Sequence, residues 1–124
     1  MRRSGILHAE LAGRINRLGH TDTVVIADCG LPVPAGVPVV DLALVSGIPR
    51  FAEVLDAYLA EVVVEGVTLA AETPGEVRSL LPDVPRTEVP HEELKKQVAG
   101  AAFVIRTGET TLYANVILHS GVPF

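Results

Sequence analysis

Apolar residues recur along this chain in two alternating patterns, which predict alternating helices and strands. Near the start, apolar side chains at helical spacing predict a helix over residues 7–18 that Gly19 ends. The short β-branched run 23–27 that follows predicts a strand. A second helix is predicted after the turn at 46–49, with an apolar face formed by Phe51, Val54, Leu55 and Tyr58.

The second half of the chain continues this alternation. Further strands are predicted at 37–44, 62–70, 86–89, 102–106 and 113–119. Thr73 and Glu76 form a capping-box pattern, which predicts a short helix with Thr73 as its N-cap. A later helix places Glu92 and Lys96 at the i,i+4 spacing of an ion pair. The turn-rich residues 107–111 are compatible with a hairpin between the last two strands.

Because strands and helices alternate from end to end, the chain is predicted to belong to the α/β class. We expect one domain, residues 1–124, built as a three-layer α/β/α sandwich. Its sheet is expected to be mixed but mostly parallel, with an antiparallel pair near the C-terminus. Hydrophobic residues make up 48% of the chain and aromatic residues only 4%, so the core must consist mainly of Val, Leu, Ile and Ala.

The charge and the cysteine content narrow the class of function. A formal net charge of -5 disfavours nucleic-acid binding, which needs clustered Lys and Arg. No apolar run approaches the roughly 20 residues that a membrane span requires. Cys29 is the only cysteine, which rules out a disulfide framework and fits a reducing cytoplasm. The apolar composition of so small a chain also favours an oligomer.

The motifs of nucleotide and metal chemistry are missing. The sequence has no GxxxxGK[ST], no GxGxxG after its first strand and no HExxH among its four histidines. We therefore expect no cofactor and no metal. Acid/base chemistry by histidine and aspartate remains, acting on a small polar ligand.

His20 and Asp28 flank the predicted strand 23–27 and are the leading candidates. A histidine titrates near neutral pH and suits proton transfer, although His20 also fits a helix C-terminus. Asp28 follows the carboxyl end of the strand, where open α/β sheets bind ligands, but it also fits a turn before Gly30. An extended segment of this length separates the two by up to roughly 26 Å. They share a pocket only if the loops bend sharply or if different copies of the chain supply them.

Three further polar residues have both a structural and a functional interpretation. His91 fits the first turn of a helix after Pro90, or a ligand contact. Tyr113 and Asn115 alternate on one face of the last predicted strand. They are either half-buried edge residues or ligand-binding residues.

Several motifs together resemble the D-ribose pyranase family, which also contains the fucose mutarotases. They are Arg17-Leu18-Gly19-His20-Thr21-Asp22, Asp28-Cys29-Gly30-Leu31-Pro32 with Pro34, Gly47-Ile48-Pro49 with Phe51, Arg106-Thr107-Gly108-Glu109, and Tyr113-Ala114-Asn115 before the ending Gly121-Val122-x-Phe124. They occur in the family's order over nearly the whole chain. The Gly-Leu-Pro after Asp28 resembles the ribose branch, since fucose mutarotases have a segment like Asp-Ala-Asn-Phe-Pro there.

The resemblance implies a role for each candidate residue. The family's proton donor corresponds to His20. Its sugar-binding residues correspond to Asp28, His91, Tyr113 and Asn115. The segment between Thr73 and Pro90 is shorter than is usual in the family and lies directly before His91.

The activity that the resemblance implies is the interconversion of the pyranose and furanose forms of D-ribose by acid/base ring opening and closure. It also implies a ring-shaped homo-oligomer, commonly a decamer of two stacked pentamers, in which the segment 113–115 completes a neighbour's pocket. The identity of the general base stays open. So do two alternatives, a mutarotase for fucose or another monosaccharide and a non-catalytic ribose-binding accessory protein.

Overall fold

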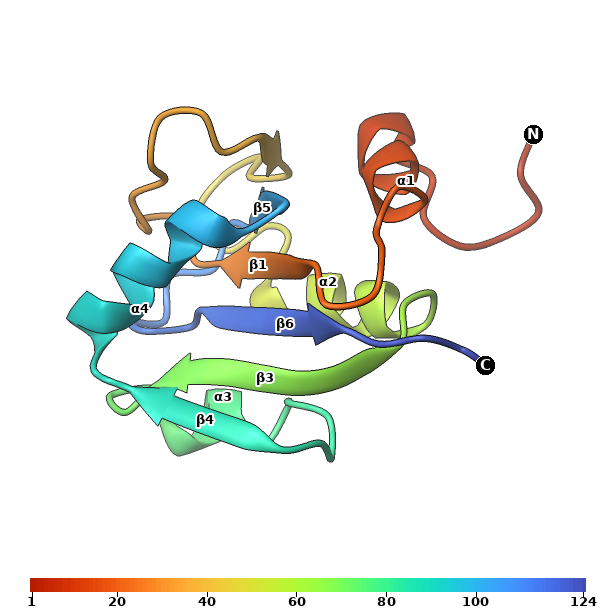
Figure 1. Cartoon of the computed structure of the whole chain (residues 1–124). Coiled ribbons are helices and arrows are strands. Elements are labelled where there is room, and N and C mark those ends of the chain that lie inside the picture. The colour runs from red at the N-terminus through yellow and green to blue at the C-terminus, as the bar shows by residue number, and fades with distance from the viewer.

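A mixed sheet of six strands forms the centre of the structure, a computed structural model that describes all residues from 1 to 124 (Figure 1). The strands are β1 (Thr23–Ala27), β2 (Val39–Asp41), β3 (Val64–Ala70), β4 (Arg86–Val89), β5 (Phe103–Arg106) and β6 (Val116–Ser120). Their order in the sheet is β2-β5-β1-β6-β3-β4. Three pairings are parallel, β1 with β5, β2 with β5 and β3 with β4, which confirms a mostly parallel mixed sheet.

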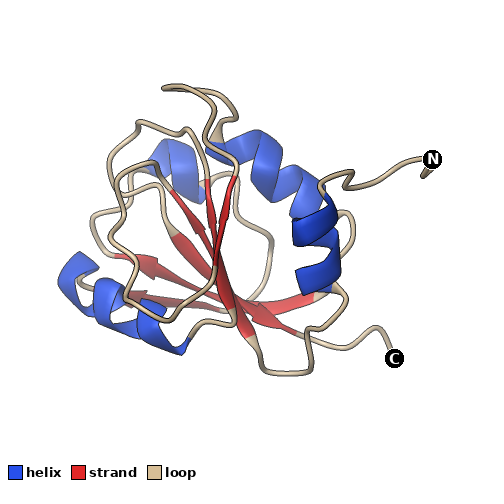
Figure 2. Ribbon diagram, turned by 90° about the horizontal axis from the view of Figure 1, so that it is seen from above, coloured by secondary structure: helices blue, strands red, loops and turns tan.

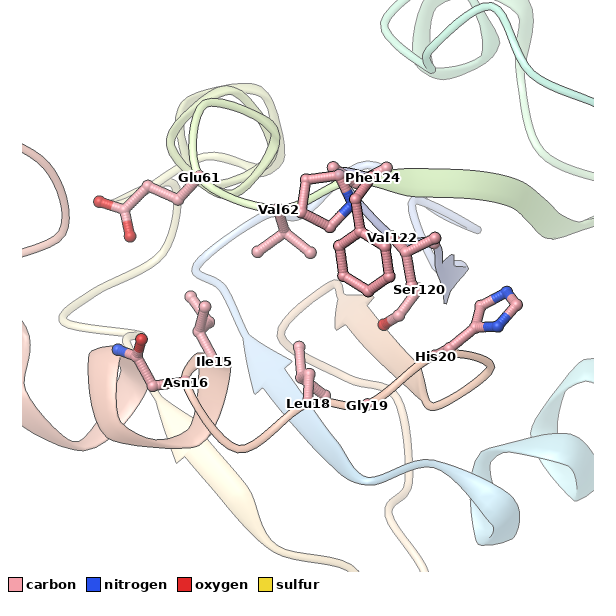
Figure 3. A pocket seen from close by; sticks show the side chains of 13 residues that line it. Ile15, Asn16, Leu18, Gly19, His20, Glu61, Val62, Ser120, Val122 and Phe124 are labelled. Carbon is pink, nitrogen blue, oxygen red and sulfur yellow. The ribbon is translucent and has the colours of Figure 1, made fainter.

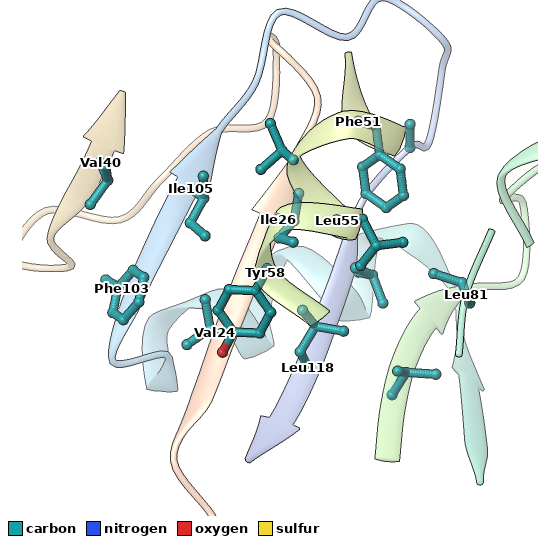
Figure 4. Packing of buried hydrophobic residues seen from close by; sticks show 14 of the residues in the cluster. Val24, Ile26, Val40, Phe51, Leu55, Tyr58, Leu81, Phe103, Ile105 and Leu118 are labelled. Atoms are coloured by element: carbon teal, nitrogen blue, oxygen red, sulfur yellow. The ribbon is translucent and has the colours of Figure 1, made fainter. Parts of the chain in front are cut away.

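Helices cover both faces of the sheet, so the predicted three layers are present (Figure 2). The helices are α1 (Ala9–Ile15), α2 (Phe51–Leu59), α3 (Gly75–Arg78) and α4 (His91–Gln97), followed by the 3-10 turn η1 (Val98–Gly100). All four residues predicted for the apolar face of α2 are buried, and Figure 4 shows Phe51, Leu55 and Tyr58 packed over the central strands. On the opposite face, Leu94 and Val98 pack in a second apolar cluster. No helix in the chain is long and apolar enough to cross a membrane.

The strand β1 has the bounds that its sequence predicts and takes part in both cores. Val24 and Ile26 belong to the cluster under α2, whereas Val25 and Ala27 belong to the cluster under α4. Side chains alternate between the faces of a strand, so an uninterrupted apolar run is what a strand covered on both faces requires. Because none of the four is more than 1% exposed, β1 is a fixed element from which residues at either end are held.

The strand β6 differs most from the sequence prediction, both in its bounds and in its pairing partners. The predicted hairpin between the last two strands is wrong, because β1 lies between β5 and β6. The strand β6 runs antiparallel to both β1 and β3, so it occupies the middle of the sheet. It begins only at Val116, and Tyr113 precedes it with a φ of 62°. Tyr113 and Asn115 are therefore loop residues rather than neighbours on a strand face.

Several predicted bounds and side-chain contacts also change. The first helix and the second and third strands are shorter than the predicted 7–18, 37–44 and 62–70. Thr73 does not cap α3, because its hydroxyl donates a hydrogen bond to the carbonyl of Tyr113. In α4 the ion pairs join residues three apart, Glu92 with Lys95 and Glu93 with Lys96, rather than Glu92 with Lys96.

Candidate functional site

The carboxyl end of β1 holds most of the candidate residues. Asp28 follows β1 and Asn115 precedes its antiparallel neighbour β6, so strand pairing brings the two together. The backbone N–H of Asp28 donates to Oδ1 of Asn115 at 2.9 Å, and Nδ2 of Asn115 donates to Oδ2 of Asp28 at 3.0 Å. Asn115 is only 1% exposed, and this reciprocal pair fixes the direction of both side chains.

Asp28 also forms the turn that the sequence predicts. Its Oδ1 accepts a hydrogen bond from the backbone N–H of Gly30 at 2.9 Å. The carboxylate is therefore held by two partners, one local and one from the start of β6. A side chain fixed in this way can orient a ligand without first losing rotamer freedom.

A cavity of about 280 Å³ opens beside Asp28 and is lined also by His91, Lys95, Leu112 and Tyr113. His91 starts α4, and its ring meets that of Tyr113 edge to face, with centroids 5.0 Å apart. Lys95 lies one helical turn beyond His91. The cavity thus combines a carboxylate, an imidazole, an ammonium and a phenol, groups that can bind the hydroxyls of a polar ligand.

Tyr113 is held in the left-handed region of backbone space. Its carbonyl accepts the hydroxyl of Thr73 at 2.9 Å, and the N–H of Ala114 donates to the carbonyl of Thr111 at 3.3 Å. A non-glycine residue with positive φ is uncommon and stays there only when its surroundings fix it. These contacts direct the Tyr113 ring toward His91 instead of along a strand.

Glu109 fixes the loop that leads to Tyr113. Its Oε1 accepts a hydrogen bond at 3.1 Å from the backbone N–H of Phe51, the first residue of α2. Its Oε2 accepts three more, from the backbone N–H groups of Thr110 and Thr111 and from the Thr111 hydroxyl. Partial burial acts to raise the pKa of Glu109, but the hydrogen bonds from Thr111, Phe51 and Thr110 outweigh it and hold that pKa below its usual range. The carboxylate joins this loop to the helix.

His20 lies at the other end of β1, at a cavity of about 440 Å³. Figure 3 shows the side chains of the α1–β1 connection and of the C-terminal segment around this cavity. The only side-chain hydrogen-bond partner of His20 is Glu65, whose two carboxylate oxygens lie 3.0 and 3.2 Å from Nε2. Because α1 ends at Ile15, the interpretation of His20 as a residue at a helix C-terminus is wrong.

The turn that contains His20 is fixed through its backbone. Thr21 has a φ of 73° and donates its N–H to the carbonyl of Ser120 at 3.0 Å. The N–H of Ser120 in turn donates to the carbonyl of Asp22 at 2.9 Å. The position of His20 therefore depends on the end of β6, as the position of Asp28 depends on its beginning.

A single chain does not bring all five predicted site residues together. It gathers Asp28, His91, Tyr113 and Asn115 at one end of β1 and places His20 at the other. The strand alone separates the ends by about 13 Å, and its neighbours leave no room for it to bend. Of the two routes that the sequence left open, bending of the loops does not bring His20 to Asp28 within this chain, although the turn at Thr21 is tight.

Three residues that line the site or hold its side chains and loops had no role predicted from the sequence. Lys95 lies at i+4 from His91, a spacing that identifies neighbours on a helix face. Glu65 and Glu109 act through contacts with residues 45 and 58 positions away, and no local pattern marks such partners. No three His, Cys, Asp or Glu side chains form a group that could hold a metal ion.

Comparisons with known proteins agree with this architecture. The chain is 57% identical to a D-ribose pyranase of Corynebacterium glutamicum (strain R) and 53% identical to one of Cutibacterium acnes, covering the full length of both chains in each comparison. Among solved structures, Bacillus subtilis RbsD complexed with D-ribose superposes with a TM-score of 0.93 at 43% identity, with complete coverage of both chains. FucU from Bifidobacterium longum gives a TM-score of 0.78 at 27% identity and covers 95% of this chain and 97% of its own.

A fucose mutarotase from Streptococcus pneumoniae, solved in complex with L-fucose, shares the fold, with a TM-score of 0.75 at 22% identity over 93% of each chain. The model of the RbsD / FucU transport protein family matches residues 1–123. This match spans both ends of β1 and every predicted site residue. The chain belongs to the RbsD / FucU family.

Proposed function

We propose that this protein is a D-ribose pyranase, an isomerase that interconverts the pyranose and furanose forms of D-ribose. The observation that favours it most is the full-length likeness to RbsD, whose structure was solved with D-ribose. The curated relatives named D-ribose pyranase are also full-length matches. The lower likeness to the L-fucose complex makes a fucose mutarotase the second candidate.

The reaction breaks and re-forms only the hemiacetal bond. An acid gives a proton to the ring oxygen while a base removes the proton of the anomeric hydroxyl, and the bond between the anomeric carbon and the ring oxygen breaks. The aldehyde chain rotates, and a different hydroxyl adds to the carbonyl as the protons return. Acid/base groups that contribute roughly 10²- to 10⁴-fold are sufficient for a reaction that already proceeds in water.

The residues divide these tasks between the two ends of β1. His20 is the proton donor, and it is a half-exposed imidazole whose Nδ1 makes no hydrogen bond within the chain. Asp28, His91, Tyr113 and Asn115 bind and orient sugar hydroxyls around the cavity beside Asp28. Lys95 adds a donor to the same cavity.

Because one chain separates these tasks, we infer a pocket shared between subunits. His20 of one copy meets the Asp28 cavity of another, in a homo-oligomer that we propose is a decamer of two pentameric rings. Large apolar side chains stand exposed at both cavities, Leu112 beside Asp28 and Val122 and Phe124 near His20, which supports contacts there. Since Asp28 is hydrogen-bonded to Asn115 of its own chain, the segment 113–115 and Asp28 would belong to the same half of the pocket.

We propose a cytoplasmic location, in keeping with the single free Cys29.

Saturation-transfer NMR on D-ribose tests the proposed activity. His20→Ala should lose at least about a hundredfold of the catalysed exchange between ring forms. His8→Ala, which removes an exposed histidine at the start of α1, is the control and should keep the exchange. Exchange of L-fucose faster than of D-ribose would favour the mutarotase, and ribose binding without faster exchange would favour the accessory protein.

Mixing two inactive variants tests the shared pocket. A His20→Ala chain and a Tyr113→Ala chain, each inactive alone, should regain part of the activity when their subunits exchange. Hybrid assemblies contain some pockets with an intact His20 from one chain and an intact Tyr113 from the other. Native mass spectrometry confirms the exchange, and absence of recovery in confirmed hybrids would contradict a pocket built from two chains.

A further inference from the structure

Glu65 occupies an irregular position in the sheet. In the pairing of β3 with β6, Val64 lies opposite Ser120 and Gly66 lies opposite His119. Two steps along β3 thus match one step along β6, and Glu65 is the extra residue of a β-bulge. A bulge bends the strand and changes the direction of a side chain, and bulges are common beside functional sites. Here the redirected side chain is the one that reaches His20.

Gly121, the residue directly after β6, leaves room for the Glu65 side chain. A Cβ at Gly121 would lie 3.2 Å from Cβ of Glu65, 3.5 Å from its Oε2 and 3.1 Å from Cγ1 of Val63. The first and last of these distances are shorter than an ordinary van der Waals contact. A larger residue at position 121 would therefore require Val63 or Glu65 to move by a few tenths of an ångström. The bulge and the glycine together set the direction of one carboxylate.

The pair contributes little to the stability of the fold. The side chains of His20 and Glu65 are 51% and 49% exposed. Exposed ion pairs of this kind typically contribute between about 0 and 1 kcal/mol, and salt weakens them. The fold positions Glu65 by a bulge and by a close contact with Gly121, although the His20–Glu65 pair stabilises the fold only slightly. This points to a role of Glu65 outside folding.

We propose that Glu65 is a positioning residue for His20, an inference that rests on the proposed role of His20 as proton donor. Both carboxylate oxygens face Nε2, so Glu65 accepts the Nε2 proton and directs Nδ1 away from itself. Nδ1, which has no partner in the chain, is then the nitrogen that meets the sugar. The hydrogen bond selects the tautomer in which Nε2 bears hydrogen, because a carboxylate has no proton to donate at neutral pH.

This arrangement gives His20 the correct form for both halves of the reaction. When His20 is protonated, Nε2–H donates to Glu65 and Nδ1–H donates its proton to the ring oxygen as the ring opens. The neutral imidazole that results keeps hydrogen on Nε2 and has a lone pair on Nδ1. It can take a proton back from the hydroxyl that closes the new ring. Glu65 accepts the Nε2–H hydrogen bond throughout and exchanges no proton.

Two substitutions separate the hydrogen bond from the charge. Glu65→Gln keeps an oxygen acceptor opposite Nε2, whereas Glu65→Val removes it and retains a residue suited to a strand. Glu88→Val is the matched control, because Glu88 is also a strand glutamate, also 49% exposed in its side chain, and paired with Arg78. All three variants should unfold at nearly the temperature of the parent protein.

The readouts are the tautomer of His20 and the ring-form exchange rate. At about pH 8, where an ordinary histidine is neutral, nitrogen-15 NMR of the labelled intact protein should show hydrogen on Nε2 in the parent and in Glu65→Gln. Glu65→Val should show a mixture of tautomers. Its kcat should fall about 30-fold with KM changed less than threefold, while Glu65→Gln should lose less than tenfold and Glu88→Val should be unchanged.

The outcomes distinguish this inference from the proposed function. If His20→Ala is inactive but Glu65→Val exchanges ribose at the parent rate, the positioning role of Glu65 is wrong and the role of His20 stands. An unchanged tautomer in Glu65→Val also overturns the inference. If His20→Ala retains full exchange, the proposed role of His20 fails, and the role of Glu65 in that reaction fails with it.

Discussion

The two ends of β1 differ in how completely their polar groups are paired. At the Asp28 end, Asp28 and Asn115 bond to each other in both directions, and Glu109 accepts hydrogen bonds from four donors. At the His20 end, the imidazole has one half-exposed partner. The hydroxyls of Tyr58 and Ser120 are buried there without a hydrogen-bond partner, whereas at the Asp28 end the buried side-chain atom without a partner is Nδ1 of His91.

This difference indicates which part of the site a single chain completes. At the Asp28 end, hydrogen bonds within one chain fix Asp28 and Asn115, so in the proposed function these two orient a sugar at little entropic cost. The His20 end provides a single titrating group in an open cavity, whose remaining walls we expect another subunit to supply. In the proposed function, binding and proton transfer are separated by the length of one buried strand. Substitutions at the two ends should therefore have different effects.

Among substitutions that change only the pairing of polar groups, the largest effect is expected for Asn115→Asp, at the Asp28 end. The substitution removes the amide that donates to Asp28 and places a second carboxylate about 3 Å from the first, where both cannot stay ionised. The free energy of unfolding at pH 7 should fall by about 2 to 3 kcal/mol. Urea unfolding measures it, and the loss should shrink as the pH is lowered, because a shared proton relieves the repulsion. Asn16→Asp, at the exposed C-cap of α1, is the comparison variant; it loses one exposed hydrogen bond to the Ala12 carbonyl and should cost less.

A smaller, pH-dependent effect is expected for Glu109→Gln. Folding lowers the pKa of Glu109 below its ordinary value of 4.5, so its carboxylate stabilises the fold above that pH. This contribution is lost as the pH falls through the lowered pKa. The parent should therefore be more stable than the variant at pH 7, and the difference should diminish below pH 4.5. Glu53→Gln, an exposed glutamate in the first turn of α2, should show no such dependence. A difference that stays constant down to pH 3 would contradict this account.

The smallest effect is expected for Tyr58→Phe, at the His20 end. Burial raises the pKa of Tyr58, and the nearby Ser120 hydroxyl offsets this only in part, so the phenol is neutral at every pH in ordinary use. Removing a buried hydroxyl that has no well-formed hydrogen bond should change the unfolding free energy by less than about 1 kcal/mol. Tyr58→Ala, which leaves a cavity under α2, should cost about 3 to 5 kcal/mol. A loss near that size for Tyr58→Phe would mean that the two ends of β1 are more alike than the structure indicates.

Local sequence patterns predicted the elements that depend on local forces. The bounds of β1 and the buried face of α2 follow from apolar periodicity, and both are correct. The hairpin and the cap at Thr73 failed because distant partners decide them. The strand β6 finds two partners that its own residues do not specify, and Thr73 bonds to a carbonyl 40 positions away instead of to its own helix.

The candidate site, like the fold, could be predicted only in part from the sequence. Histidine, aspartate and tyrosine were recognised as suitable chemical groups, and the family resemblance selected the positions. The sequence alone did not show that Asp28 and Asn115 share a hydrogen-bonded pair, since 87 positions separate them. It also did not indicate Glu65, whose direction depends on a bulge that only the register of β3 against β6 reveals.

The place of β6 in the sheet has a consequence for synthesis of the protein on the ribosome. Residues 116–120 leave the ribosome after every other strand, yet they join β1 to β3. Until then the nascent chain has two separate groups of strands with two unpaired apolar edges, which are prone to aggregate. The carbonyl of Ser120 and the pair formed by Asn115 arrive with the same segment. A chain stalled before residue 115 would therefore lack the contacts that hold both ends of the site, and a chaperone that protects strand edges should bind it more strongly than the finished protein.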